Sequence, residues 1–435
     1  MALKSLATAA QVQSILKTNS IMVEVDGSIR RISLDKFIDS INAGNEELLR
    51  SVAWGVPLKQ GSQTSSLWGR VGNLDMWALF KSQCGRYLVK NNGHAAKLSV
   101  TNSGIFADGT ALDESKGHVL FYAPKLYYKV QEDAVTGIPT LWMSLIPIGG
   151  HFIPETKIGA YKGSMASSAL VSRSGVAPAG SKTISQFWAA AQVNGADWGL
   201  INYGHKQLMM MLLLSEYGSP NAQEVLGNGV TGTNNSSDYT TPLSWNLGAT
   251  KSLGDACGKV DFSWENSGGT TVLNANHVSL FGIEDPYALQ WEFTQGIYCG
   301  NSGNANQDGT EVFIYEGNRL PSAEELANHP VGDYRQLTRL TSSGYVKEET
   351  VGEFFDLVPK THGGGGTSYW GDYHYANATG QVVCWGGSAD LGARCGLAFA
   401  ASGYAWSYSS ASIGSRLAYY GELTVMSGAQ LMAEV

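Results

Sequence analysis

From about residue 67 to its end, the chain is a succession of short apolar or alternating runs separated by glycine-rich turns. Runs of this kind, bounded by turn residues, are typical of strands, and the clearest are 119–122, 126–130 and 141–147. Two stretches have helical character: 185–193, which Ser181 or Thr183 can cap, and 203–217, which stops at Gly218-Ser219-Pro220. No repeat of fixed period is visible. The pattern predicts an α+β fold with two main helices, short twisted strands and long irregular loops.

The first 66 residues differ from the rest. Residues 1–20 have apolar positions at mixed helical spacing, and residues 21–33 flank Asp26-Gly27, a strong two-residue hairpin signal. Residues 34–41 are expected to form a helix that 46–52 continues, and the polar stretch 59–66 is typical of a linker. We therefore expect a small α/β attachment or oligomerisation module over 1–66 and a larger domain over 67–435.

Charge and hydropathy exclude several classes of protein. Lys and Arg number 29 against 37 Asp and Glu, a net charge of −8, so the chain offers no basic face for nucleic acid. The longest apolar run, 208–214, has seven residues, whereas a bilayer requires about 20. Gln11, Gln13 and Ser14 interrupt any apolar signal region near the start. We expect a chain without a signal peptide, made in the cytoplasm and not inserted into a membrane.

Three glycine- or asparagine-rich motifs resemble ligand sites only superficially. Residues 227–232 match G-x-G-x-x-G but follow a helical stretch, and 363–366 lack the Lys and Ser/Thr of a phosphate loop, so both are predicted to be plain loops. Residues 304–309 resemble the start of a calcium loop, but the closing acid, Glu316, is one residue out of place. A turn is favoured there over a metal site. No metal or cofactor is predicted.

Catalytic signatures are absent from the sequence pattern. The eight histidines are scattered, and none lies beside a nucleophile with an acid in local register. The five cysteines are far apart and form no C-x-x-C pair, which favours buried small hydrophobic side chains; they are Cys84, Cys257, Cys299, Cys384 and Cys395. The chain is not predicted to be an enzyme, although this pattern does not test for a catalytic site assembled from residues distant in the sequence.

The most informative segment is 398–412, fifteen uncharged residues with five Ser, five Ala, one Gly and four aromatic residues. Large aromatic rings surrounded by small adaptable residues are typical of a binding surface. The alternative is a Ser/Ala-rich loop whose aromatic rings face the core. The strand-like alternation of 413–420 that follows favours a displayed loop, because a loop mounted on a buried strand is a common way to present a recognition surface.

This region resembles the variable proteins of diversity-generating retroelements. The resemblance rests on 386–397, on the Ser/Ala/aromatic loop and on Ile413-Gly414-Ser415-Arg416-Leu417. Ile283-Glu284-Asp285-Pro286-Tyr287 with Trp291-Glu292-Phe293 is similar to the family's Glu-Asn-Pro-Phe-Gly-Asn-x-Trp-Glu-Trp motif, and 84–90 and 198–223 are similar to phage fibre proteins. The family has a C-type lectin fold of the formylglycine-generating-enzyme type. The resemblance covers roughly 70–425, whereas the calcium-lectin signatures and the enzyme branch's cysteine spacing are absent.

In that family a C-terminal segment is diversified, and the resemblance implies that this segment is about 386–420 here. The diversified, ligand-binding positions it implies are Asp390, Leu391, Arg394, Phe399, Ala401, Gly403, Tyr404, Tyr408, Ser410 and Ser412. The scaffold positions it implies are Gly392, Gly396, Leu397, Trp406, Ile413, Gly414 and Arg416. We expect exposed positions to change at a cost of no more than about 0.5 kcal/mol each.

The function implied by the resemblance is that of a phage or prophage receptor-binding protein, a tail- or head-fibre adhesin of the virion. Its partners would be a bacterial surface protein or glycan and, through the N-terminal module, other virion proteins; a homotrimer is expected. Two alternatives stay open. A structural virion protein, for capsid decoration or the baseplate, would bury its aromatic rings between subunits. A sulfatase-modifying-type enzyme would require a reactive cysteine of low pKa.

Overall fold

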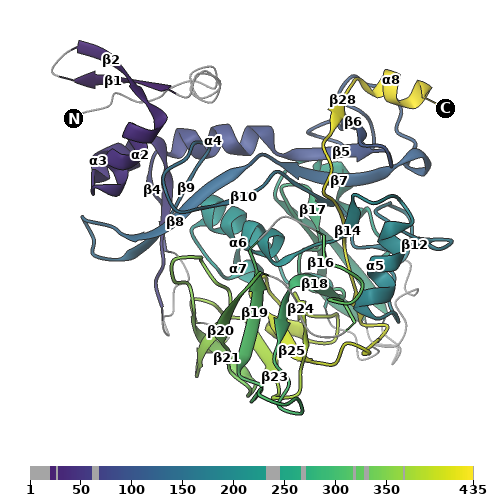
Figure 1. The fold of residues 1–435 in the computed structure, drawn as a ribbon. Helices are drawn as coiled ribbons and strands as arrows, with labels where there is room; N and C mark the ends of the chain where they lie inside the picture. The colour runs from purple at the N-terminus through teal and green to yellow at the C-terminus, as the bar shows by residue number, and fades with distance from the viewer. Residues whose placement is uncertain are drawn as a thin grey trace.

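The computed structural model describes residues 20–25, 28–60, 68–231, 245–265, 271–316, 320–327, 333–365 and 368–434. Strands outnumber helices, and several curled sheets enclose one central helix, as Figure 1 shows. The α+β prediction is therefore confirmed. None of the described helices has the length and apolarity needed to cross a bilayer.

Three large sheets make up most of the molecule. The first has the spatial order β10 (His151–Ile153), β8 (Leu126–Glu132), β9 (Pro139–Ser144), β3 (Trp54–Pro57), β4 (Val71–Gly72). The second has the order β14 (Trp198–Leu200), β27 (Leu417–Tyr419), β11 (Thr156–Gly159), β7 (His118–Ala123), β5 (Gly85–Val89), β6 (His94–Lys97), β28 (Thr424–Val425). The third has the order β20 (Tyr334–Thr338), β19 (Glu311–Tyr315), β18 (Trp291–Cys299), β24 (Val382–Trp385), β25 (Ala400–Tyr404), β23 (Tyr373–Ala376), β21 (Gly344–Glu349), β22 (Pro359–His362), and β26 (Ile413–Gly414) pairs with β18.

Smaller sheets and the helices complete the fold. The smaller sheets are β1 (Ser20–Val25) with β2 (Ser28–Ser33), β12 (Ser164–Ala166) with β13 (Ala169–Val171), and β15 (Gly258–Glu265) with β16 (Thr271–Leu280) and β17 (Ile283–Glu284). The α-helices are α2 (Leu34–Asn42), α3 (Glu46–Val52), α4 (Leu74–Gln83), α5 (Ile184–Gln192), α6 (Tyr203–Tyr217), α7 (Ala222–Val225) and α8 (Gly428–Ala433). Three short 3₁₀ turns are η1 (Glu114–Lys116), η3 (Ala249–Leu253) and η4 (Gly392–Arg394).

Local signals gave the ends of both expected helices correctly. Thr183 caps α5, with its side chain accepting from the Gln186 amide, and α6 ends at Gly218, whose φ of +61° is the left-handed conformation that glycine adopts readily. Beside these two main helices, α4, α7 and α8 also form after residue 67. Asn73 caps α4 through the amides of Asp75 and Met76.

Helix α6 lies between the first and third sheets (Figure 1). Its residues 208–214 are all buried, so the helix is apolar around its whole circumference and forms part of the main core. The indole Nε1 of Trp54, on β3, donates to Ser215 Oγ at 2.8 Å.

The N-terminal segment does not have a separate hydrophobic core. The expected β-hairpin over 21–33 forms as β1 and β2, but β3 pairs with β9 in the register Trp54↔Met143. Phe37 and Leu49, on α2 and α3, belong to the same core as Met143 and α6. A boundary near residue 66 therefore does not separate two cores, because residues of both short helices share one core with the sheet of the larger part. The expected helix over 1–20 and most of the linker 59–66 lie outside the described residues.

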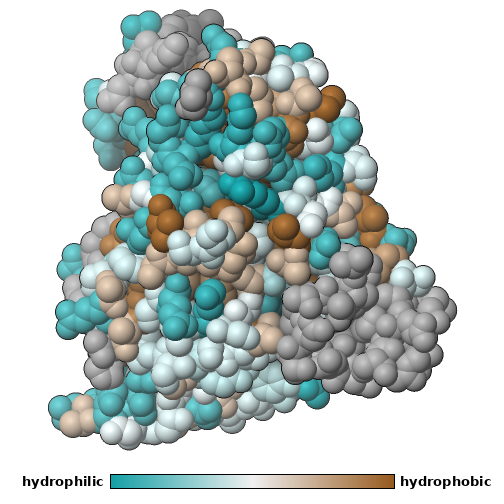
Figure 2. Space-filling view, turned by 90° about the vertical axis from the view of Figure 1, so that its right-hand side faces the viewer, coloured by the Kyte–Doolittle hydropathy of each residue, from teal (hydrophilic) through white to brown (hydrophobic). Residues whose placement is uncertain are grey.

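Figure 2 shows the side of the molecule that carries α8, on the right in Figure 1. Hydrophilic residues predominate in its upper half, and hydrophobic residues occur there in small separate groups. The upper half of this face therefore offers mainly polar contacts.

Candidate ligand-binding face

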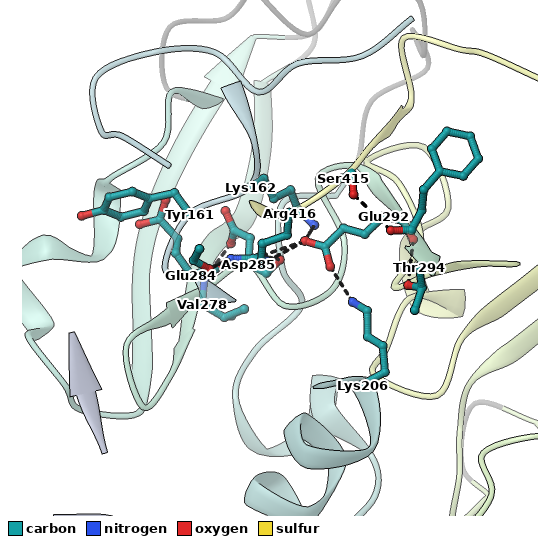
Figure 3. Close-up of polar contacts among 12 residues, drawn as sticks. Tyr161, Lys162, Lys206, Val278, Glu284, Asp285, Glu292, Thr294, Ser415 and Arg416 are labelled. Carbon is teal, nitrogen blue, oxygen red and sulfur yellow. Dashed lines mark hydrogen bonds and ion pairs between the residues drawn. The ribbon is translucent and has the colours of Figure 1, made fainter. Parts of the chain in front are cut away.

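A fully buried ion cluster joins the two sequence motifs that carry the family resemblance. Glu292, on β18, accepts from Arg416, just after β26: Oε1 lies 2.9 Å from Nε and 2.8 Å from Nη2. Lys162 Nζ contacts the same oxygen at 3.1 Å, and Lys206 Nζ, on α6, contacts Oε2. All four side chains are at most 1% exposed (Figure 3). The cluster thus connects β18, α6 and the C-terminal strands.

The electrostatics of the cluster keep Glu292 ionised. Burial by itself raises the pKa of a carboxyl group, but Arg416, Lys162 and Lys206 together hold the pKa of Glu292 well below its usual value. Burial lowers the pKa of Lys162 to about 8, against the opposing effect of Glu292. Arg416 also donates to the carbonyl oxygens of Gly159 and Ala160 and of residues 284 and 285. Its guanidinium group therefore fixes three segments at once.

A neighbouring acidic group has the spacing of a metal site but is occupied by protein donors. Among the described residues, the side chains of His277, Glu284 and Asp285 lie close enough together to share one metal ion. The Glu284 carboxylate accepts from the amides of Gly248 and Thr250 and from Thr250 Oγ1, at 2.6–2.7 Å. Asp285 accepts from the Val278 amide at 3.1 Å and lies 2.7 Å from His277 Nδ1. These contacts explain the cluster as structural.

The three motifs predicted to be loops or turns form loops or turns wherever their residues are described. Residues 227–231 follow α7 as a loop, and residues 363–365 follow β22 in the same way. In the 304–309 stretch, Asp308 Oδ1 accepts from the Thr310 amide at 2.8 Å, and Glu311 accepts from the amides of Asp308 and Gly309. These are the bonds of a turn.

The segment 386–420 is mounted on this framework by strands and by glycines that cannot be replaced without a clash. β24 and β25 pair antiparallel, β26 lies beside β18, and β27 lies between β14 and β11. A Cβ at Gly396 would lie 1.9 Å from Asp372 Oδ1, and a Cβ at Gly414 would lie 2.3 Å from Gln290 Oε1. Asp372 is itself buried and accepts from the Ala398 amide at 2.7 Å. Of the other scaffold positions, Leu397, Trp406, Ile413 and Arg416 are buried, whereas Gly392 is half-buried with open space around it.

The ten expected ligand-binding positions divide into two groups. Eight reach the surface: Asp390, Arg394 and Tyr408 are exposed, and Leu391, Gly403, Tyr404, Ser410 and Ser412 are half-buried. Phe399 and Ala401 are buried, at 0% and 1% exposure, which corrects the expectation that they are exposed neighbours. The Phe399 ring packs 4.5 Å from that of Trp291, because β25 is covered by the core on the side that these two residues face.

Aromatic rings and one guanidinium group form the face that the remaining positions share. The rings of Tyr404 and Tyr408 stack with centroids 4.3 Å apart and planes 16° apart. The Arg394 guanidinium lies 5.0 Å from the ring centroid of Tyr373 and 5.9 Å from that of Tyr375, and it donates to the Tyr375 hydroxyl. Such a surface combines large rigid contact area with a charged hydrogen-bond donor.

The sequence pattern did not identify the tyrosines on β21 and β23 as part of this face. Tyr373 packs 4.9 Å from Tyr375 and 5.0 Å from Tyr345, edge-on to the latter. All three precede the segment 386–420, and parallel pairing of β23 with β25 brings them beside it. The signal that could have found Tyr373 and Tyr375 is the Tyr/Trp cluster that follows the glycine run ending at residue 366.

The thiols are not activated. Cys84, Cys299, Cys384 and Cys395 are buried, Cys257 is partly buried, and none forms a disulfide. Burial raises the pKa of every one, to about 11 for Cys299 and about 12 for Cys257. All five are therefore protonated at neutral pH, in contrast to a nucleophilic cysteine.

No known protein-family model matches the sequence, and no curated protein matches it.

Proposed function

We propose that this chain is a receptor-binding adhesin of a phage or prophage virion, with a C-type lectin fold of the diversity-generating-retroelement type. Its face of Tyr404, Tyr408, Arg394 and their neighbours would bind a bacterial surface protein or glycan without catalysis. One observation carries the proposal: the segment 386–420 exposes Arg394 and Tyr408, and in part Tyr404, while Gly396, Gly414 and Arg416 are fixed in the core.

The chemistry of the face supports binding. Tyrosine and arginine are enriched among the residues that carry most of the energy at protein interfaces. The tyrosine rings here are already stacked on one another or on Arg394, so little side-chain entropy is lost when a partner arrives. The serines around them, including Ser410 and Ser412, are small and polar and can adapt to different partners.

The framework supports the family assignment. Two motifs more than a hundred residues apart in the chain, 291–293 and 413–417, are adjacent in space. Trp291 pairs with Ile413 and Glu292 with Gly414 in the parallel β18–β26 register, and Glu292 binds Arg416. A buried ion cluster at this junction keeps the segment's base constant while its exposed positions can differ, as a diversified protein requires.

The test is a binding assay on a panel of bacterial cells. Purified protein is compared with a Tyr404→Ala/Tyr408→Ala variant, with melting used to verify folding. Phe152→Ala is the matched control, because Phe152 is 47% exposed and lies on β10 in a different sheet. Binding lost or redirected in the double variant alone, with melting unchanged, supports the proposal. Equal binding by all three proteins would place the contact elsewhere.

The two alternatives predict different outcomes. If no form binds any cell and the double variant instead blocks particle assembly, the protein is a structural virion component. An enzyme of the sulfatase-modifying type would lose a measurable property when its cysteines are alkylated under native conditions. We expect no such loss, because the thiols are protonated and at most partly exposed. The expected homotrimer is checked by light scattering at micromolar concentration.

A further inference from the structure

A basic groove lies beside the end of α8, the helix on the right in Figure 1. Its volume is about 630 Å³, within the range of small-molecule sites. Lys90, Lys116 and Arg173 line it, and the one acid among its lining residues is Glu434. The groove is therefore lined by three positive charges, although the net charge of the chain is −8.

Backbone carbonyl groups hold each cation in place. Arg173 donates from Nε to the Gly117 oxygen at 3.1 Å and from Nη2 to the Ser115 oxygen at 3.0 Å. Lys116 Nζ donates to the Met432 oxygen at 2.7 Å, and Lys90 Nζ donates to the Glu434 oxygen at 3.0 Å. These bonds position the charges without neutralising them, because a carbonyl group carries no net charge.

The chain itself supplies one anion to the groove. The carboxylate of Glu434 lies 3.3 Å from Lys90 Nζ through Oε2 and 2.7 Å from His94 Nδ1 through Oε1. Near η1, Glu114 binds Lys251 and Ser174, whereas Asp113 accepts from the Ser115 amide and also attracts Lys116 and Arg173 electrostatically. Glu434 therefore balances Lys90, whereas Lys116 and Arg173 form no ion pair with a carboxylate of the described residues and feel only the more distant charge of Asp113.

We propose that this groove binds a compact multivalent oxyanion of the phosphate type, seated among Lys90, Lys116 and Arg173, with Glu434 as an internal competitor. Guanidinium and ammonium groups are the side chains that proteins use for phosphate oxygens, Arg173 as a planar fork and the lysines as point charges. The site is separate from the tyrosine face and does not depend on the function proposed for it.

The test uses inorganic phosphate and pyrophosphate as probes, with calorimetric titration of the full chain at constant ionic strength in chloride. Arg173→Gln is expected to weaken binding about tenfold, because a charged hydrogen-bond donor is lost. Glu434→Gln is expected to tighten binding about threefold to tenfold, because the competing charge is removed while the backbone carbonyl of residue 434 still accepts from Lys90. Lys360→Gln, an exposed lysine on β22, is the control and should leave binding unchanged.

The opposite signs make the test decisive. A variant that merely unfolds loses binding, so tightening by Glu434→Gln cannot arise from misfolding. The proposal is overturned if wild-type protein binds neither probe, or if both groove variants change affinity no more than Lys360→Gln does. Weakening by Glu434→Gln would also overturn it, since Glu434 would then support the ligand rather than compete with it.

Discussion

Replacing Glu292 with glutamine removes the carboxylate that three buried cations share. Among the described residues, the ammonium groups of Lys162 and Lys206 form no other hydrogen bond or ion pair, and Arg416 keeps only its carbonyl acceptors. Removing one partner of a buried ion pair typically costs about 3–5 kcal/mol, because the remaining charge stays desolvated and unpaired. We expect the free energy of unfolding of Glu292→Gln to fall by about this amount.

The loss is measurable by two methods. Urea unfolding followed by tryptophan fluorescence gives the free energy directly, with an unchanged denaturant slope as the check on two-state behaviour. The entropy of unfolding scales as about 2.1 cal/mol/K per residue, so the expected loss lowers the melting temperature of a chain of this length by roughly 3–6 °C. Glu324→Gln is the matched control, because Glu324 is exposed and makes no ion pair among the described residues. Its stability should stay within about 0.5 kcal/mol of wild type.

A second substitution tests the cause of the loss. If the loss comes from stranded positive charge, adding Lys206→Met to Glu292→Gln should recover part of it, because one buried unpaired cation is removed and its volume is kept. Two results would refute the reasoning. One is a free energy of unfolding for Glu292→Gln within about 1 kcal/mol of wild type. The other is a double variant that is less stable than Glu292→Gln by as much as Lys206→Met alone destabilises the wild type.

Three further predictions concern the face and its support. Gly396→Ala should destabilise the protein by more than about 2 kcal/mol, because its Cβ would meet Asp372 Oδ1 at 1.9 Å. Gly392→Ala should cost about 1 kcal/mol, because Gly392 has open space around it and only its φ of +56° disfavours a side chain. Urea unfolding of both variants separates the steric clash from the backbone strain. Phe399→Ala should cost about 3–5 kcal/mol and Tyr408→Ala less than about 1 kcal/mol, since one ring is buried and the other is exposed; equal losses would contradict the assignment of Phe399 to the core. Burial raises the pKa of Asp372 to about 8, so between about pH 4 and pH 8 the folded state retains a proton that the unfolded state has lost, and stability should fall as pH rises through that window. Asp372→Asn should flatten this profile in unfolding experiments at pH 5, 6.5 and 8, and an unchanged slope would show that another group causes it.

The candidate site was predictable from sequence where its chemistry is local. The composition of 398–412 indicated a displayed segment, and Tyr404 and Tyr408 both reach the surface, as that pattern suggested. The inward direction of Phe399 and Ala401 was not predictable, because it depends on which strands cover β25. The contribution of Tyr345, Tyr373 and Tyr375 was missed for the same reason: pairing of β23 with β25 joins separate parts of the chain.

The sequence by itself determined the elements whose stabilising contacts lie within a few residues. Thr183 caps α5 through a residue three positions later, Gly218 ends α6 with a bond to Leu214, and the β1–β2 hairpin pairs across a two-residue turn. Only the tertiary structure decided what those elements support. Glu292 meets Arg416 across 124 residues of chain, and the ion pair exists because strand pairing brings two distant segments into one low-dielectric interior. Hydrogen bonds within a turn are specified by neighbouring residues, whereas buried charges find their partners only when the whole core has closed around them.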